Sequence, residues 1–440
     1  MHRVKTLIPA FVLTFLAGCG GGGDGGLIPP PDGVGACTVD EEKQFVLDAM
    51  RDLYFWNTLL PANVNINDYA TAEDLLAFLT SFQPLDSFSF ITTTEQDTQF
   101  FGEGQFAGFG FSYRFENNAA RFRFVYSGSP AANAGFERGQ EIVAVDGQTV
   151  EALGASGLAN AFGPSDVGIE RTFRIRRLDG SEFEVLVIKD VVTIDPVPQF
   201  RVISTPGGNI GYIEFATFIS TAESELATAF NQFQSANVNA VVLDLRYNGG
   251  GLVRIAELLG DYLGGGVANQ DVFSRTLFNA DNADLNSTEL FQLLNNSLSL
   301  SRLVVIATGS TASASELVIN SMEPHAEVVI VGDSTFGKPV GQSGILFCAN
   351  TKTLRATTFE TVNSLNEGQY FDGLPVDCPA ADDLDQPVGA DTDPSLATAL
   401  SYLETGACPS VSPVQQKLRE PRAADRPARS EPAFIYLDSV

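Results

Sequence analysis

The spacing of apolar residues changes along the chain, and each change predicts a different kind of structure. Between residues 38 and 95, apolar side chains such as Phe45, Val46 and Met50 recur at helical intervals. A second helical run follows over residues 71–82, TAEDLLAFLTSF. We therefore predict an N-terminal helical domain over residues 37–100.

Residues 104–192 consist of short β-like runs separated by turn signals. The runs include ARFRFVYS, QEIVAVDG and EFEVLVI, and the pairs Asp146-Gly147 and Asp179-Gly180 are typical of turns between strands. One short helix fits the segment SPAANAGF. This pattern predicts a β-rich domain that follows the helical one.

From residue 200 to residue 408, β-branched runs alternate with helical ones. Runs such as AVVLDLRYN, LVVIATG and EVVIVG are separated by helices expected at residues 222–233, from Leu252 and after Ser313. A strand that is covered on both faces is apolar throughout, so the alternation predicts an α/β domain with a buried sheet. Residues 409–440 are rich in Pro, Arg and Ser, which predicts a disordered tail.

The N-terminus has the layout of an export signal. A basic start precedes an apolar run over residues 7–16, and small residues lead to Cys19. The ending LAGC resembles the bacterial lipobox, which implies removal of residues 1–18 and attachment of lipid to the Cys19 thiol; the alternative is a plain signal with an incidental cysteine. The Gly- and Pro-rich residues 19–36 are typical of a tether. We expect a protein anchored to a bacterial membrane in the cell envelope, facing the periplasm or the cell exterior.

Composition limits the partners. The chain of 440 residues is 44% hydrophobic, enough for a sizeable core, and has a formal net charge of −28. Nucleic-acid binding depends on clustered Lys and Arg, so this charge argues against a nucleic-acid partner. Neither a CxxC pair nor a His-Cys cluster occurs in the sequence. We therefore predict neither a metal site nor a cofactor.

The remaining cysteines are Cys37, Cys348, Cys378 and Cys408. In an oxidising compartment they permit two disulfides in three connectivities, which the sequence does not resolve. Of these we favour Cys348 with Cys378 and Cys37 with Cys408, because the second pair would join the two ends of the folded chain.

The β-rich segment carries a more specific pattern. GFGFSY over residues 108–113 is followed by GSPAANAGFERGQEIVAVDGQTVE. This order resembles a PDZ domain, in which backbone N–H groups of a loop hold the terminal carboxylate of a peptide and the peptide adds a strand to the sheet. The resemblance implies that Phe109, Gly110 and Phe111 form that loop. The alternative is a β-domain whose glycines serve only turns.

The stretch GSTASASELVIN, residues 309–320, raises the question of a nucleophile. Ser313 and Glu316 match the Ser-x-x-Glu capping box, so a capping role competes with a catalytic one. His325 is expected at the far end of the following helix, more than about 10 Å from Ser313. A lysine can replace imidazole as a base if burial keeps its amine neutral, and Lys338 follows a buried strand.

These segments together resemble the carboxy-terminal processing, or tail-specific, proteases, which are PDZ-containing serine peptidases with a Ser-Lys dyad on a crotonase-like α/β core. TASASELVIN and FGKPVGQ carry the resemblance, with Lys338 placed 25 residues after Ser313. It implies that Ser313 is the nucleophile, Lys338 the general base and Gln342 the group that orients the lysine. We then expect Thr311 or Ser310 to serve the turn, and Ser315 and Glu316 to support the first helical turn, so that Ser313 stays free.

A second segment of the family matches VVLDLRYNGGG, residues 241–251. The resemblance implies that Gly249, Gly250 and Ala314 form the oxyanion hole, the last at a helix N-terminus that favours negative charge. Asp244 and Arg246 are expected to be structural, as an ion pair or a capping group under this loop. The chain departs from the family pattern at Pro324, where some members have Asp, and after Lys338, where Pro-Val replaces Gly-Thr-Val.

The function implied is that of an exported, lipid-anchored serine endopeptidase, whose PDZ domain binds the C-terminal segment of protein or peptide substrates. One alternative is a catalytically silent peptide-binding scaffold with the same fold. Another is a different acyl-transfer reaction on a crotonase-like core. The acidic composition argues against a coenzyme A substrate, because its phosphates would require basic residues.

Overall fold

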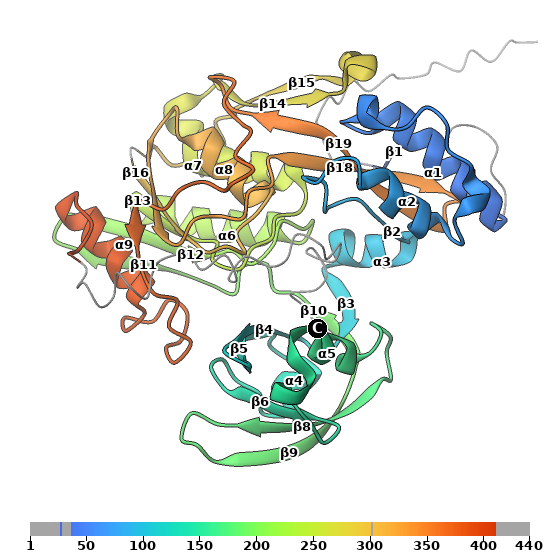
Figure 1. Ribbon diagram of the computed structural model, residues 1–440. Coiled ribbons are helices and arrows are strands. Elements are labelled where there is room, and N and C mark those ends of the chain that lie inside the picture. The colour runs from blue at the N-terminus through green and yellow to red at the C-terminus, as the bar shows by residue number, and fades with distance from the viewer. Residues whose placement is uncertain (1–26, 29–36, 301, 411–440) are drawn as a thin grey trace, which may run out of the picture.

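The computed structural model describes residues 27–28, 37–300 and 302–410 (Figure 1). Two helices, α1 (Val39–Leu53) and α2 (Ala72–Thr80), begin with capping boxes that satisfy their first free amides. Their apolar faces pack against two strands, β18 (Val340–Phe347) and β19 (Lys352–Val362). The helices predicted for this region are confirmed. Shorter helical segments of the N-terminal region are Asn57–Leu59, Ile66–Asp68, α3 (Thr94–Thr98) and Gln99–Glu103.

The β-rich region forms a sheet of its own, with the order β4-β5-β6-β8-β9 and β7 beside β6. Its core is aromatic and includes Phe111, Phe122, Phe136, Phe162 and Phe173. The predicted short helix is present as α4. The elements are β4 (Phe111–Glu116), β5 (Ala119–Val125), α4 (Pro130–Asn133), β6 (Glu141–Val145), β7 (Gln148–Thr149), α5 (Val150–Phe162), β8 (Glu170–Arg176) and β9 (Glu182–Ile188).

Two antiparallel strands, β3 (Gln105–Gly108) and β10 (Asp190–Thr193), connect this sheet to the rest of the chain (Figure 1).

The α/β region is built on a sheet with the order β11-β12-β13-β16-β17-β20, parallel from β12 onward. Side chains of β13 alternate between two cores: Val241 and Leu243 pack under α6, α7 and α8, whereas Val242 packs under α9. The predicted α/β fold with a buried sheet is confirmed. The elements are β11 (Gln199–Thr205), β12 (Gly208–Glu214), α6 (Ala222–Ser235), β13 (Val238–Asp244), α7 (Val253–Ala268), β16 (Arg302–Ala307), α8 (Ala314–Met322), β17 (Glu327–Gly332), β20 (Cys378–Pro379) and α9 (Pro394–Thr405).

A further sheet joins the N-terminal and C-terminal halves of the chain. Its order is β1-β18-β19-β14-β15, and β2 also pairs with β19. The sheet therefore brings a segment from the helical region beside β19, the neighbour of the strand β18 that contains Gln342. The remaining elements are β1 (Leu27–Ile28), β2 (Phe90–Thr93), β14 (Val272–Phe278), a short helical segment Ala280–Leu285 and β15 (Ser287–Leu290).

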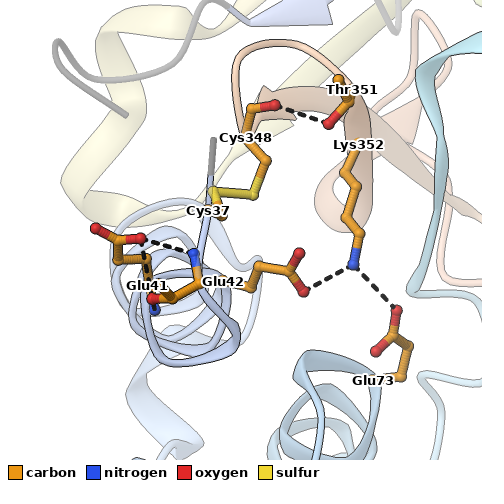
Figure 2. The surroundings of a disulfide bond; sticks show 8 residues. Cys37, Glu41, Glu42, Glu73, Cys348, Thr351 and Lys352 are labelled. Carbon is orange, nitrogen blue, oxygen red and sulfur yellow. Dashed lines mark hydrogen bonds and ion pairs between the residues drawn. A yellow bond between two sulfur atoms is a disulfide. The ribbon is translucent and has the colours of Figure 1, made fainter. Parts of the chain in front are cut away.

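The cysteines form the disulfides Cys37–Cys348 and Cys378–Cys408. The predicted pairing, Cys348 with Cys378 and Cys37 with Cys408, is wrong. Cys37 precedes α1, which packs on β18, and Cys348 follows β18, so these two meet (Figure 2). Cys378 lies in β20, and α9 packs on that sheet, which brings Cys408 to it.

The first disulfide is flanked by an ion-paired lysine. Lys352 Nζ lies 2.7 Å from Glu42 Oε2 and 4.0 Å from Glu73 Oε1, which links β19 to both N-terminal helices (Figure 2).

Several predictions made from the ends of the chain concern residues that the structure does not describe. They are the export signal over residues 1–18, Cys19 and the tail beyond residue 410. Of the tether, only Leu27–Ile28 is described, as β1 beside β18. Among the described residues, none of the helices combines the length and the hydropathy needed to span a bilayer.

Candidate active site

Ser313 lies at the junction between the turn after β16 and the first residue of α8. Its backbone has φ 57° and ψ −116°, a conformation that residues with a side chain rarely adopt. Hydrogen bonds hold the turn in place: Thr311 Oγ1 donates to Leu245 O at 2.7 Å, and Ala312 N–H donates to Asn248 O at 3.1 Å. The expectation that Thr311 serves the turn is confirmed. His325 lies beyond the other end of α8, with Nε2 3.2 Å from Val272 O.

The glycine loop after β13 lies against Ser313. Gly250 has φ +101°, and a Cβ there would lie 2.7 Å from Ser313 Cβ and 2.9 Å from Ala314 N, so only glycine permits this approach. Asn248 shapes the loop, because its Oδ1 accepts the Gly250 N–H at 2.9 Å. The predicted oxyanion residues Gly249, Gly250 and Ala314 are thus brought together, but the Gly250 N–H is already engaged within the loop.

Ser315 also joins α8 to this loop. It was expected to support the first helical turn, but its Oγ donates to Asn248 O at 2.9 Å. Below the loop, Arg246 Nη2 lies 2.7 Å from Asp244 Oδ2 and 2.6 Å from Asp393 Oδ2, and all three residues are buried. The structural role predicted for Asp244 and Arg246 is confirmed.

Glu316 connects the segment of Ser313 to the segment of Lys338. Its Oε2 accepts the N–H of Ser313 at 2.9 Å and that of Lys338 at 2.8 Å. Its Oε1 accepts from Thr335 Oγ1 at 2.5 Å and from Gly337 N–H at 2.7 Å. Burial raises the pKa of Glu316 to about 6, although these hydrogen bonds favour the charged form. The capping bond to Ser313 N–H was predicted, but the contacts to residues 335–338 were not.

Lys338 is buried, with 4% of its surface exposed. Its Nζ donates to Gln342 Oε1 at 2.7 Å and lies 4.7 Å from the centre of the Phe88 ring. Burial lowers the pKa of Lys338 to about 8, although the carboxylates of Asp86 and Glu316 favour the charged amine. Roughly a tenth of the amine is therefore neutral at pH 7, far more than for a lysine with its ordinary pKa.

The three predicted catalytic residues line one cavity. Ser313, Lys338 and Gln342 share a space of about 40 Å³ with residues from three other parts of the chain. Its remaining walls are formed by Phe101, Gly251, Leu252, Val253, Gly341, Arg355 and Phe359. Sequence reasoning missed the walls from the N-terminal region and from β19, because the sequence offers no spacing signal for contacts between segments this far apart.

The predicted peptide-binding loop lies at the start of β4, which is an edge strand of the β-rich sheet in the described chain. Gly110 has φ +86°, and a Cβ there would lie 2.3 Å from Ser129 Cβ. Its carbonyl accepts from Tyr126 N–H at 2.9 Å and from Ser129 Oγ at 3.2 Å. Phe109 and Phe111 are buried in the aromatic core, so only their backbone can contact a ligand.

The fold is that of an α/β protein with an additional PDZ-like domain. Its site places a serine and a buried lysine in one cavity. Family models match in three places: "Peptidase family S41" over residues 209–375, "Peptidase S41 N-terminal domain" over residues 41–90 and "PDZ domain" over residues 123–161. Residues 41–90 and 209–375 thus match peptidase family S41.

Curated relatives include the carboxyl-terminal-processing protease of Synechocystis sp., 26% identical over 280 residues, which are 62% of this chain and 62% of that protein. The chloroplastic carboxyl-terminal-processing peptidase 2 of Arabidopsis thaliana is 31% identical over 230 residues, or 49% of this chain and 41% of that protein. The first three curated relatives are matched over 42%, 62% and 50% of their length.

Two solved structures share the fold. A putative S41 protease from Bacteroides fragilis has a TM-score of 0.65 at 24% identity, covering 82% of this chain and 97% of that one. The photosystem II D1 C-terminal processing protease has a TM-score of 0.53 at 20% identity, covering 82% of this chain and 100% of that one.

Proposed function

We propose that the chain is a serine endopeptidase that cleaves proteins or peptides with Ser313 as nucleophile and Lys338 as general base. The observation that carries the proposal is the buried amine of Lys338, with a pKa of about 8, in the cavity that Ser313 lines. A base with a pKa near the working pH combines a useful neutral fraction with a real affinity for the proton. The match of residues 209–375 to peptidase family S41 supports the same assignment.

The chemistry follows from these positions. Ser313 Oγ attacks the scissile carbonyl while neutral Lys338 takes the hydroxyl proton, and the same proton then goes to the departing amine, which leaves an acyl-enzyme. Lys338 next takes a proton from water, whose oxygen attacks the ester carbonyl. The ester bond to Ser313 Oγ then breaks, and Lys338 returns the proton to Oγ, which releases the acid product and restores the neutral amine. The charge that develops on the carbonyl oxygen is stabilised by the N–H groups of Gly249 and Ala314, because the Gly250 N–H is engaged by Asn248.

The PDZ domain is proposed to bind the C-terminal segment of the substrate. The edge position of β4 supports this role, since a peptide can add a strand there, and the backbone of residues 109–111 begins that strand. We also propose that the protein is exported and held at a bacterial membrane by a lipid on Cys19. The sequence LAGC supports the anchor.

A fluorophosphonate probe tests the catalytic assignment. The wild-type chain is expected to be acylated at Ser313 and to degrade casein, and Ser313→Ala to lose both activities completely. Lys338→Ala should lose at least about a hundredfold in rate, since general-base catalysis contributes that much. Labelled peptides identified by mass spectrometry locate the site, and thermal unfolding checks that the variants are folded.

Ser235→Ala is the matched control, because Ser235 is a serine in α6 whose Oγ donates to Asn231 O at 2.8 Å within its own helix. Acylation of Ser313→Ala at the wild-type rate would contradict the assignment. Capture of C-terminal peptides with no acylation of the wild type would instead identify a catalytically silent scaffold.

A further inference from the structure

One turn of the N-terminal region, residues 86–89 between α2 and β2, reaches Lys338. Asp86 closes the turn: its Oδ1 accepts the N–H of Phe88 at 3.0 Å and that of Ser89 at 3.1 Å, and its Oδ2 accepts from Ser89 Oγ at 2.7 Å. Thr357 Oγ1 of β19 donates to Asp86 Oδ1 at 3.1 Å. The turn is therefore held both internally and to the sheet.

The ring of Phe88 covers the amine of Lys338. Phe88 is 6% exposed and packs in an apolar cluster with Ala312, Phe336 and Val340, residues that flank the two predicted catalytic positions. Its ring centre lies 6.1 Å from that of Phe336 and 4.7 Å from Lys338 Nζ. A smaller side chain at position 88 would open this side of the amine to water.

The carbonyl of Phe88 determines how the Gln342 amide faces. Gln342 Nε2 donates to Phe88 O and, at 3.3 Å, to Arg355 O. With its NH₂ group between two carbonyls, the amide presents Oε1 to Lys338 Nζ at 2.7 Å. The opposite orientation would set an NH₂ group against the amine and two carbonyls against an amide oxygen.

We propose that Phe88 is a positioning residue for Lys338 and Gln342, so that the N-terminal helical region completes the catalytic centre; this inference rests on the proposed function. The ring excludes water from one side of the amine. The carbonyl, acting through Gln342 Oε1, fixes the direction of one Lys338 N–H. The remaining positions on the amine nitrogen can then turn toward the cavity and Ser313.

Charged groups around Lys338 come from several elements. They are Asp86 in the turn, Glu316 in α8 and Arg355 in β19, the last ion-paired at 2.7 Å with Asp97 of α3. Burial lowers the pKa of Lys338, the two carboxylates raise it and Arg355 lowers it. Opening the site to water should therefore raise this pKa, and removing the charge of Asp86 should lower it further.

The test is the rate of Ser313 acylation by a fluorophosphonate probe from about pH 6 to about pH 10, measured on the full chain. Phe88→Ala is expected to move the midpoint of the profile up by about one pH unit, which makes acylation about tenfold slower at pH 7 and restores the rate at high pH. Phe88→Leu should fall between this variant and the wild type. Asp86→Asn, which keeps an acceptor oxygen, should move the midpoint down.

Phe82→Ala is the matched control, because Phe82 follows α2, is 41% exposed and contacts Phe78 edge to face. Its profile should match the wild type. If the midpoint is unshifted in Phe88→Ala or in Phe88→Leu, the inference is overturned, whether the rate is normal or uniformly low. The proposed function is then unaffected. A wild-type chain that is not acylated at any pH overturns the proposed function and the inference with it.

Discussion

Glu316 shows how much of a site one residue can organise. A carboxylate offers two oxygens, each able to accept two hydrogen bonds, and here all four positions are used. The sequence predicts only the capping half of this role, because Ser-x-x-Glu is a local pattern. The partners at residues 335–338 come from a loop, and no periodic pattern of apolar residues predicts where a loop packs. The link between the two predicted catalytic segments could therefore not be predicted from the sequence.

Glu316→Gln tests this link at the residue scale. An amide has one acceptor oxygen where the carboxylate has two, so two of the four buried donors would face an NH₂ group. We expect a loss of about 2–4 kcal/mol in the free energy of unfolding and slower acylation of Ser313. Denaturant unfolding and probe labelling measure the two effects. Glu323→Gln changes an exposed residue at the other end of α8 and is the control. Equal stability of both variants would show that Glu316 does not link the two segments.

At the scale of elements, the apolar strands were predictable and the polar ones were not. β13, β16 and β17 are apolar runs between helices, and the sequence predicts them and the α/β fold. β19 is also buried, but it contains Thr353, Thr357, Thr358 and Thr361, so no apolar run marks it as the strand that meets β2, β14 and β18. The wrong disulfide pairing follows from this, since the position of Cys348 depends on which elements pack against β18.

The two disulfides make a testable comparison between elements. Cys37–Cys348 closes 311 residues and Cys378–Cys408 closes 30. The entropy that a crosslink removes from the unfolded chain grows with the logarithm of the loop, a difference of about 2 kcal/mol here. We expect the double variant Cys37→Ser and Cys348→Ser to lose that much more stability than Cys378→Ser and Cys408→Ser. Denaturant unfolding without reductant measures both, and equal losses would contradict the expectation.

At the scale of the whole molecule, the PDZ domain contacts the loop that holds the site. Arg138 of the PDZ domain donates from Nη1 to Tyr247 Oη at 2.7 Å and from Nη2 to Asp382 Oδ1 at 2.8 Å. Tyr247 precedes Asn248, whose side chain shapes the glycine loop. Arg123 Nη1 also donates to Ser310 Oγ, at 3.1 Å, in the turn before Ser313. The sequence predicts the PDZ domain from its local pattern, but a charge pair between distant segments leaves no such pattern.

Arg138→Ala should therefore loosen the glycine loop without any change in the α/β core. Burial raises the pKa of Asp382, but Arg138 and Arg246 outweigh this effect and hold the pKa below its usual value. The variant therefore leaves a carboxylate in the interface with less positive charge to stabilise it. We expect amide hydrogen exchange over residues 245–251 to become at least about tenfold faster. Arg177→Ala is the matched control, because Arg177 lies in the same domain and stacks on Phe183 at 4.0 Å. If exchange over this loop is equally slow in both variants, docking of the PDZ domain does not hold the loop. The hydrogen bonds of Asn248 are then sufficient to hold it.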